Sequence, residues 1–478
     1  MIAQRQRRPW LVLAGLTAAA FLIHGYHFGI EDGAIYVAGI LKLSDPSLFP
    51  HDSQLFTPQT QAAFFAPLVA LLVRITRIPL EYLDLLLYVA CMFALLAGCY
   101  ALARACFLSE RERWFGVAMV AALLTLPIAG TAIYIADQHL HPRVPATAAL
   151  LFAISATLDR RWIAAVVLVI LAAGLHPQMA FYGAGFLLVL AWPDSLRISG
   201  RSALLVGPFS LFSQPMTEAW RAALRRSTSH YLWQWHWYEW VGAIGPSVLL
   251  TVSARFMPNE KGQRLCRSAA VYGLVVLAAG MLITIPEVFE PLTPLQPMRG
   301  LHLVYIVLVV VSGGLISRWT GPIPWRWALI LVPLAASMCF AQRQLFSQSD
   351  HLDLPWRAPR NPYVQAFLWA REHTAPNTLF ALDPDYMAHS DYYGFRAWGR
   401  RSMLADDKDL GIAGLFPQSA ERAYLEIRIR SPWASADFAA LRDVYGVTMV
   451  VLDRDHPAKL VCPYQNERVR LCSLRWLQ

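Results

Sequence analysis

The sequence predicts a mainly α-helical membrane bundle of about eleven spans that carries a small C-terminal α/β domain outside the cytoplasm. Hydrophobic residues make up 56% of the 478 residues and charged residues only 15%, whereas soluble domains average about 45–50% apolar and about 25% charged residues. Basic residues fall mostly between the hydrophobic segments, and after Gln342 the long apolar runs stop. These three observations indicate an integral membrane protein with a polar C-terminal part.

Eleven segments are apolar enough to be expected as spans, each of which needs about 20 residues. The clearest candidates are residues 10–30, 83–106, 115–135, 268–285, 300–317 and 324–341. Shorter or interrupted candidates are residues 144–158, 162–175, 178–192, 203–214 and 241–254. The N-terminal apolar run is long and shows no clear cleavage site, so we expect it to be retained as the first span.

Residues 61–78 are also apolar, but Pro67, Arg74 and Pro79 interrupt or flank the run. If this segment does not cross, the basic stretches between the spans all lie on the cytoplasmic side with the N-terminus, as the positive-inside tendency requires. We therefore expect a helix that lies along the outer membrane face or dips partway into it. The net charge of +9 then serves orientation and is not a signal of nucleic-acid binding.

The expected domain organisation has three parts. A transmembrane bundle covers residues 1–341 and includes an external loop at 31–82. Prolines mark a linker at 342–362, and residues 363–478 form a soluble α/β domain. With an odd number of spans, this domain lies outside the cytoplasm.

Within the soluble domain, apolar runs predict strands and one amphipathic run predicts a helix. The expected strands are residues 378–383, 401–405 and 447–453. The expected helix covers residues 435–445, with Ser435 as its N-cap and Gly446 as its stop. Cys462 and Cys472 flank a segment that could fold back as a hairpin, and a disulfide is plausible there outside the cytoplasm.

Glu31 and Asp32 are adjacent acids at the point where the first span should emerge into water. Like-charged neighbours beside apolar surface disfavour each other's ionised form, so such a pair needs a reason. One hypothesis is catalysis, in which a carboxylate acts as a general base. The alternative is that the two acids only cap and solvate the end of a helix.

Asp137, His139, His141 and Arg143 fall within one short polar segment. Two imidazoles and a carboxylate could hold a divalent metal, although their spacing matches no specific zinc motif. Arg143, together with a histidine, could instead bind phosphate oxygens through its planar guanidinium. A purely structural loop is the third interpretation.

Further polar candidates fall on the same expected outer face. His176 and Gln178 stand at an interruption between two apolar runs. Arg299 precedes a long span, where a helix N-terminus favours an anion, although a simple interfacial anchor is the alternative. Glu239 lies in the aromatic stretch 230–240, which forms either an interfacial belt or a wall that faces a sugar or lipid.

This arrangement resembles the GT-C superfamily of polytopic membrane glycosyltransferases. The similar features are the N-terminal span, the acids Glu31 and Asp32 soon after it, the external loop with membrane-hugging helices, and the external C-terminal domain. Several short segments look like a group of bacterial polytopic proteins, namely residues 45–50, 139–143, 296–299 and 395–402. No strict Asp-x-Asp follows the first span, so the adjacent Glu–Asp departs from that form.

The resemblance implies that a sugar moves from a polyprenyl-phosphate donor to a glycan, lipid or protein hydroxyl at the outer face of a bacterial inner membrane. It implies that Glu31 or Asp32 accepts the proton of the attacking hydroxyl. Arg299 and Arg143, with His139 or His141, would hold the leaving phosphate and stabilise its growing charge. A divalent metal is an option but is not required by this scheme.

Two other functions stay open. A transporter or flippase for a lipid-linked solute predicts ionisable residues near mid-bilayer and an internal repeat, and neither is clear in the sequence. A non-catalytic subunit of an envelope assembly would use the α/β domain as a docking module. Polar residues collected on one face favour the enzyme over both.

Overall fold

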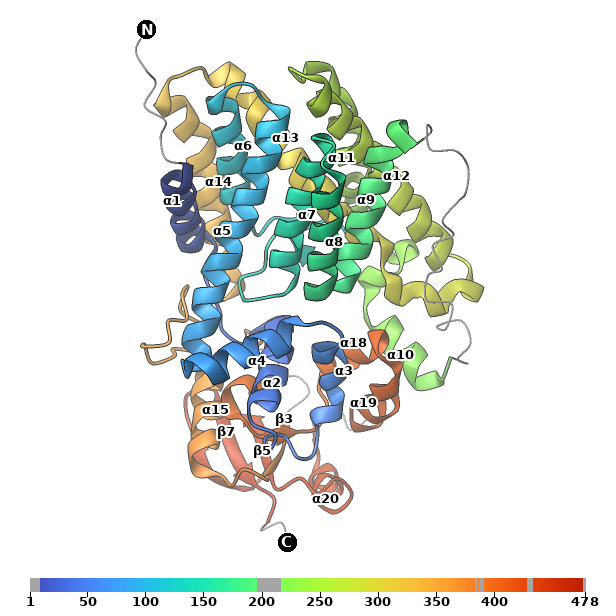
Figure 1. Cartoon of the computed structure of the whole chain (residues 1–478). Helices are drawn as coiled ribbons and strands as arrows, with labels where there is room; N and C mark the ends of the chain where they lie inside the picture. Colours follow the sequence, from blue (N-terminus) through green and yellow to red (C-terminus); the bar gives the residue numbers. More distant parts are fainter. Residues whose placement is uncertain (1–8, 196–215, 383–385, 387–390, 428–432, 476–478) are drawn as a thin grey trace. The chain divides into compact units, whose positions relative to one another are not determined.

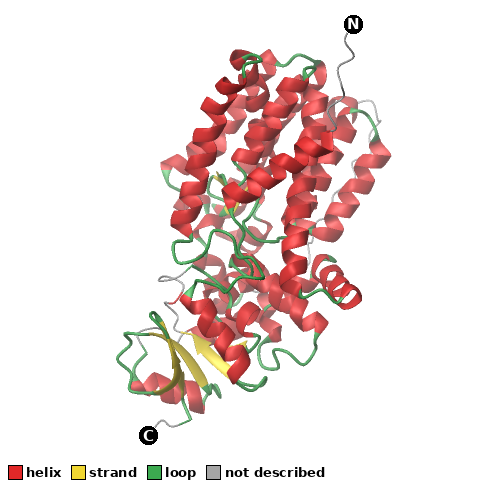
Figure 2. Ribbon diagram, turned by 90° about the vertical axis from the view of Figure 1, so that its left-hand side faces the viewer, coloured by secondary structure: helices red, strands yellow, loops and turns green. Residues whose placement is uncertain are grey.

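A computed structural model of the chain describes residues 9–195, 216–382, 386, 391–427 and 433–475. This part of the chain is mainly helical and has a small mixed sheet near the C-terminus (Figure 1, Figure 2). The chain divides into two compact units. Unit 1 comprises Met1–Gly25, Leu86–Pro215 and Thr228–Gln342, and unit 2 comprises Tyr26–Leu85, Met216–Ser227 and Arg343–Gln478.

Unit 1 is a helical bundle in which several consecutive helices run side by side (Figure 1). Its longer helices are α1 (Pro9–His24), α5 (Leu80–Cys106, from Leu86 onward), α6 (Glu110–Ala122), α7 (Arg143–Leu158), α8 (Trp162–Leu175), α9 (Pro177–Ser195), α11 (Trp237–Ser253), α12 (Glu260–Thr284), α13 (Leu301–Thr320) and α14 (Pro324–Leu345, up to Gln342). Short 3-10 turns link them at η3 (Thr228–His230), η4 (Leu232–Gln234), η5 (Ala254–Phe256), η6 (Glu287–Leu295) and η7 (Pro297–Gly300).

Four helical segments of the described chain are long and apolar enough to cross a membrane. They are Leu80–Cys106, Glu260–Thr284, Glu287–Thr320 and Trp325–Leu345. Helix α8 is shorter, yet it exposes Ile163, Val166 and Ile170 along its length. Contiguous apolar surface of this kind is unusual on a soluble monomer and is typical of a helix that faces lipid.

Two expected spans end earlier than the sequence suggested. Helix α1 stops at His24 instead of residue 30, and Gly25 follows it with a φ of 81°. Helix α6 stops at Ala122, so a continuous span over 115–135 is wrong. Strands β1 (Pro127–Ile128) and β2 (Ile133–Tyr134) pair antiparallel instead, because proline cannot continue the helix and Gly130 takes a φ of 65° in the turn. The expected span 203–214 lies outside the described residues.

Unit 2 surrounds a five-stranded sheet with short helices (Figure 2). The strands are β3 (Leu379–Leu382), β4 (Ser402–Met403), β5 (Met449–Asp453), β6 (Val461–Gln465) and β7 (Val469–Ser473). The helices are α2 (Glu31–Ser44), η1 (Ser53–Leu55), α3 (Thr57–Gln61), α4 (Phe65–Thr76), α10 (Glu218–Arg226), α15 (Pro362–His373), α17 (Phe395–Gly399), α18 (Asp407–Leu415), η8 (Pro417–Ser419), α19 (Ala420–Ile427) and α20 (Ser435–Asp443).

The sheet has the order β4-β3-β5-β7-β6, in which β4, β3 and β5 are parallel and β7 and β6 are antiparallel to their neighbours. The three expected strands are thus confirmed as β3, β4 and β5. Strand β3 is buried along its whole length, which explains why it reads as an unbroken apolar run. The expected hairpin is β6–β7, and Cys462 and Cys472 form the expected disulfide across it.

Apolar side chains fill both faces of this sheet. Phe367 of α15 and Phe395 of α17 pack with Phe380 on one face. Phe438 of α20 packs with Val450 on the other face. Helices on both faces of parallel strands are the usual α/β arrangement, so the expected α/β domain is confirmed.

Helix α20 confirms the expected helix but not its expected cap. The N-cap is Ala434, one residue earlier than Ser435. The Asp437 carboxylate accepts the backbone N–H of Ala434 at 2.7 Å. Gly446 follows the helix with a φ of 72°, as a C-terminal stop requires.

Residues 26–85, which include the expected external loop, belong to unit 2 instead of the bundle. Gly394 donates a backbone hydrogen bond to Gly29 at 2.9 Å, and the backbone N–H of Glu31 donates to Tyr392 at 3.2 Å. A Cβ atom at Gly394 would lie 2.3 Å from that of Ala34, so only glycine allows α2 to approach so closely. The loop is therefore a structural part of the α/β unit.

Helix α4 falls within the segment 61–78, which we expected to lie along the outer membrane face or to dip partway into it. It has 12 residues, which gives a length of about 18 Å and is too short to cross a bilayer. Val69 and Ala70 are buried, whereas Leu68, Leu71 and Ile75 are exposed. The helix is thus apolar on two faces and packs one of them within unit 2.

Candidate functional site

Three polar segments that the sequence singled out meet in unit 1. They are the loop 137–142 before α7, the junction of α8 and α9 at His176, and turn η7 before α13. Helices α7, α8 and α9 run back and forth, so Arg143 and His176 return to the same end of the bundle (Figure 1). The His141 and His176 rings lie 5.8 Å apart. The His176 ring also interacts electrostatically with both Arg143 and Arg299.

Arg143 is the first residue of α7 and is only 4% exposed. Its backbone N–H donates to His141 Nδ1 at 3.0 Å. A neutral imidazole that accepts at Nδ1 carries its hydrogen on Nε2. That Nε2 lies 3.5 Å from Arg143 Nη2, so two hydrogen-bond donors stand side by side. Asp137 balances part of the charge, with Oδ1 3.6 Å from Arg143 Nη1.

Arg299 reaches the same region from η7. Its Nη1 donates to Gln178 Oε1 at 3.3 Å. The amide nitrogen of Gln178 donates to the carbonyls of Pro294 and Leu295 at 3.2 and 3.3 Å, which fixes the direction of its oxygen. The Tyr182 hydroxyl donates to the Gln296 carbonyl at 2.9 Å. Helix α9 therefore braces the turn that carries Arg299.

His302 ties α13 to the loop that carries Asp137. It is fully buried, and its Nε2–H donates to the Ile135 carbonyl at 2.9 Å. His139 lies beside His141 with ring centroids 5.8 Å apart. The sequence-predicted residues Asp137, His139, His141, Arg143, His176, Gln178 and Arg299 thus form one cluster in unit 1, which we call the arginine–histidine cluster.

This cluster has the features of an anion site. Helices α7, α9 and α13 begin at Arg143, Pro177 and Leu301, and a helix N-terminus favours negative charge. Arg143 lies against the Asp137 carboxylate, and Arg299 adds a second guanidinium group to the same cluster. Arginine and imidazole N–H groups are suited to the oxygens of a phosphate.

The arrangement does not fit a metal. Among the described residues, no three His, Cys, Asp or Glu side chains converge as metal ligands. The hypothesis of a metal held by Asp137, His139 and His141 is therefore corrected. The physical reason is Arg143, because its guanidinium already places a positive charge between Asp137 and His141.

Glu239 lies apart from these interactions and has a local role. Its Oε2 accepts the backbone N–H of His236 at 2.7 Å, which caps the start of α11. Trp233, Trp237 and Tyr238 around it are exposed. These rings fit both interpretations of the aromatic stretch, an interfacial belt or a wall that faces a ligand.

The acid pair lies in unit 2 at the first turn of α2. Lys408 of α18 places Nζ 2.7 Å from Asp32 Oδ1 and 3.1 Å from Glu31 Oε2. Burial disfavours the ammonium, but Asp32 and Glu31 outweigh this effect and raise the pKa of Lys408. Glu31 takes a φ of 50°, a left-handed conformation that is uncommon for residues other than glycine. These contacts hold the two carboxylates in fixed positions.

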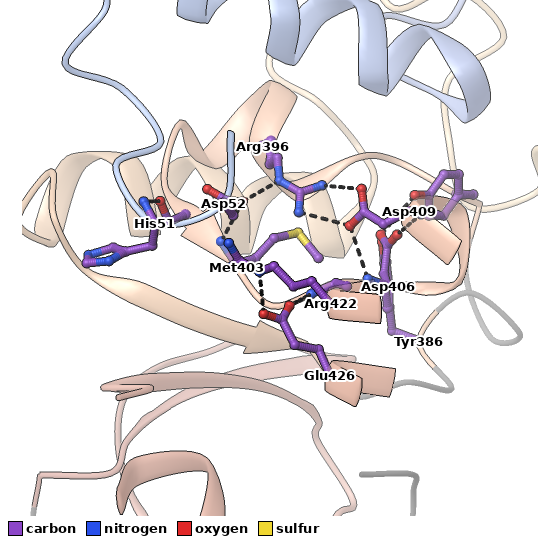
Figure 3. Close-up of polar contacts among 12 residues, drawn as sticks. His51, Asp52, Tyr386, Arg396, Met403, Asp406, Asp409, Arg422 and Glu426 are labelled. Carbon is purple, nitrogen blue, oxygen red and sulfur yellow. Dashed lines mark hydrogen bonds and ion pairs between the residues drawn. The ribbon is translucent and has the colours of Figure 1, made fainter. Parts of the chain in front are cut away.

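A buried ion network supports the helix that carries Lys408. Arg396 of α17 donates through Nε to Asp52 Oδ2 at 2.5 Å (Figure 3). Its two terminal nitrogens donate to Asp409 Oδ1 and Oδ2 at 3.0 and 2.9 Å. Asp52 and Asp409 are fully buried. Burial disfavours the charge, yet Asp409 and Asp52 raise the pKa of Arg396 well above its usual value.

Further hydrogen bonds extend this network along α18. Asp52 Oδ2 also accepts the backbone N–H of Met403 at 3.1 Å, and Asp406 caps α18 by accepting the N–H of Asp409 at 3.0 Å (Figure 3). Residues Lys408, Arg396 and Asp409 were missed as partners of the first 52 residues, because no local pattern reports so distant a pairing.

No protein-family model matches the sequence, and no curated protein is significantly similar to it.

Proposed function

We propose that the chain is a membrane glycosyltransferase that moves a sugar from a polyprenyl-phosphate donor to an acceptor hydroxyl at the outer membrane face. The observation that carries this proposal is the arginine–histidine cluster of unit 1. Two arginines, the Nε2–H group of His141 and three helix N-termini support a receptor for a phosphate group. The apolar helices around it suit a phosphate carried on a long lipid.

In the proposed reaction, the acceptor oxygen attacks the anomeric carbon of the sugar as the bond to the donor phosphate breaks. The proton of the acceptor hydroxyl passes to a carboxylate base, for which Asp32 and Glu31 are the candidates predicted from the sequence. The electron pair of the broken bond stays on the phosphate, whose charge Arg143 and Arg299 stabilise. A single displacement of this kind inverts the anomeric configuration.

Lys408 adds a positioning role that the sequence did not suggest. It neutralises one of two adjacent negative charges, so both carboxylates can stay ionised side by side. An ionised carboxylate is the form that can accept a proton. Lys408 is therefore proposed to hold the base in its active state and direction.

The proposed topology places the N-terminus in the cytoplasm and the C-terminal domain outside, in a bacterial inner membrane. It keeps a bundle of many spans, in which shorter apolar helices cross together with the four long ones. The disulfide between Cys462 and Cys472 supports an oxidising compartment for that domain.

The test is transfer by the purified full-length protein in detergent. The protein is incubated with labelled polyprenyl-phosphate sugars and a membrane extract that supplies acceptors. We expect labelled acceptor from the wild type and a loss of about 10²–10⁴-fold in Asp32→Asn or Glu31→Gln, as removal of a general base typically costs. Asp443→Asn, an exposed acid of α20, is the matched control.

Three results contradict the proposal or part of it. Normal transfer by both Asp32→Asn and Glu31→Gln would show that neither acid is the required base. Movement of the labelled lipid across a vesicle membrane without transfer indicates a flippase. The absence of both transfer and movement, with an intact folded protein, indicates a non-catalytic envelope subunit.

A further inference from the structure

Unit 2 contains a partly open pocket that the proposed reaction does not use. Its cavity volume is about 210 Å³, below the range of about 300–1,000 Å³ that is usual for drug-sized ligands, so it suits a small ligand. Its walls are the first turn of α5, the segment 350–361, one side of α15, and three aromatic rings. Asp32, Glu31 and Lys408 are not among the residues that line it.

One wall is aromatic. The Trp398 indole N–H donates to the Phe28 carbonyl at 3.1 Å, and the two rings meet edge to face at 5.2 Å. Tyr393 lies beyond Trp398, with ring centroids 6.4 Å apart. Tyr82 lines the pocket and is 43% exposed. Rings fixed in this way offer rigid apolar faces with polar edges.

A second wall presents a fixed carboxylate. Asp353 Oδ2 accepts the Tyr393 hydroxyl at 2.5 Å and lies 3.2 Å from His27 Nδ1. Its backbone N–H donates to the Tyr26 carbonyl at 2.8 Å. Both side-chain contacts use Oδ2, so Oδ1 is the oxygen that can accept from a ligand. The Asp353 side chain is 12% exposed, which leaves it reachable from the pocket.

A third wall presents guanidinium donors beside a shared acid. Glu81 Oε1 lies 2.8 Å from Arg400 Nη2 and 3.7 Å from Arg371 Nη1. Arg371 lines the pocket and is about one-third exposed. Glu81 offsets part of its charge, and its guanidinium N–H groups can donate hydrogen bonds to a ligand.

The charges of the lining are close to balance. The pocket is lined by three acids, Glu81, Asp350 and Asp353, and by two arginines, Arg357 and Arg371. A phosphate would find no excess of positive charge among these side chains, and a cation would find Glu81 and Asp353 already paired with Arg400, Tyr393 and His27. Hydroxyl groups both donate and accept, so they can use acids and arginines together. The C–H faces of a sugar ring suit the aromatic wall.

We propose that this pocket binds a neutral saccharide through Asp353, Arg371 and the rings of Tyr82 and Trp398. The proposal rests on the pocket of unit 2 and does not depend on the proposed transfer reaction. Loss of saccharide binding and loss of transfer are measured separately, so each proposal can fail without the other. Asp32→Asn should leave saccharide binding unchanged.

The test is titration of the full-length protein in detergent with glucose, galactose, mannose, N-acetylglucosamine and their disaccharides, followed by ligand-observed NMR. We expect saturable binding of at least one of these sugars. Asp353→Asn and Arg371→Gln should each weaken it about tenfold or more, as loss of a hydrogen bond to a charged group typically does. Tyr82→Ala tests the aromatic wall without touching a buried group.

Matched controls are Asp443→Asn, Arg442→Gln and Tyr238→Ala, which change exposed residues outside the pocket. Thermal unfolding of every variant separates lost binding from lost folding. No saturable binding by any of these sugars overturns the proposal. So does binding that Tyr82→Ala and Arg371→Gln leave unchanged, or preferential binding of inorganic phosphate or an organic amine at the same residues.

Discussion

Lys408 Nζ lies 2.7 Å from Asp32 Oδ1, so an ammonium from α18 neutralises a carboxylate at the first turn of α2. The same ammonium lies 3.1 Å from Glu31 Oε2. The two acids therefore form an ion-paired group with a residue far away in the sequence. This arrangement goes beyond the capping of a helix end, which needs only the local backbone.

The first prediction concerns Lys408. Lys408→Met removes the cation and leaves Glu31 and Asp32 as adjacent like charges, which raises the pKa at which one of them first takes a proton. We expect transfer to fall at least about tenfold at neutral pH, since a base that is protonated or misplaced loses much of its effect. The acidic limb of the pH–rate profile should move to higher pH.

Lys408→Arg keeps the charge and is the control for this prediction. It should retain most of the transfer activity. Because the acids are partly exposed, we expect either variant to change the free energy of unfolding by only about 1 kcal/mol or less. An unchanged pH–rate profile in Lys408→Met would contradict the positioning role.

The second prediction concerns Arg396. Arg396→Met leaves the buried carboxylates of Asp52 and Asp409 without their shared cation. Breaking a buried pair in this way typically costs about 3–5 kcal/mol. We expect a clearly lower unfolding midpoint in detergent, whereas Arg442→Met on the exposed side of α20 should change stability by about 0.5 kcal/mol or less. Equal midpoints for the two variants would show that the network contributes little.

The third prediction concerns the pH dependence of stability. Burial raises the pKa of the Asp409 carboxyl to about 7 although Arg396 opposes the shift, and Asp406 adds to it. In the unfolded chain the same group titrates near 3.9. Between about pH 4 and pH 7 the folded state therefore holds a proton that the unfolded state has lost, so stability falls as the pH rises.

We expect the unfolding midpoint of the wild type to decrease as the pH rises across this window. Asp409→Asn carries no titrating group and should flatten this part of the profile. The measurement is thermal unfolding at a series of pH values. The raised pKa of Asp409 would be contradicted if the wild-type midpoint rose from pH 4 to pH 7 and Asp409→Asn removed that rise.

The arginine–histidine cluster could be predicted from the sequence because its members lie beside the ends of helices. Interruptions such as His176 mark where a helix pair turns back, and helices that turn back bring their ends together. Arg299 was predicted near a helix N-terminus because it precedes a long apolar run, and Arg143 was predicted in the polar segment with His139 and His141. The structure brings both into electrostatic contact with His176.

The ion pairs of Asp52 and Arg396 within unit 2 could not be predicted from the sequence. Asp52 and Arg396 are separated by more than 300 residues, and neither lies in a repeated pattern that reports a partner. The span predicted around Pro127 was wrong for a different reason. Their apolar character predicted a span, and only the turn at Gly130 makes the segment a hairpin. Apolar composition predicts burial or lipid contact, but it does not by itself predict helix over strand.

The fourth prediction concerns the disulfide. Cys462 and Cys472 close a short loop at the β6–β7 hairpin. If the C-terminal domain lies outside the cytoplasm, the two thiols should resist alkylation in intact cells until a reductant is added. The double variant Cys462→Ser/Cys472→Ser should lose about 3 kcal/mol of stability, as expected for a loop of this length. Free thiols at both positions in freshly prepared membranes would contradict the proposed orientation.

The last prediction concerns recognition of the donor lipid. Arg143→Gln and Arg299→Gln should each weaken binding of a polyprenyl phosphate about tenfold or more, because each removes charge-assisted hydrogen bonds to the phosphate. Arg299→Lys keeps the charge but not the planar geometry, so an intermediate loss is expected. Arg326→Gln, an exposed arginine at the start of α14, is the matched control.

Binding is measured by displacement of a labelled polyprenyl phosphate from the purified protein. Affinity of the wild type should also fall as salt increases, because an electrostatic attraction is screened. The uncharged polyprenol of the same length should bind weakly to every variant and show no such dependence. If Arg143→Gln and Arg299→Gln bind the phosphate as tightly as Arg326→Gln does, the cluster is not its receptor, and its residues serve the packing of α7, α9 and α13 alone.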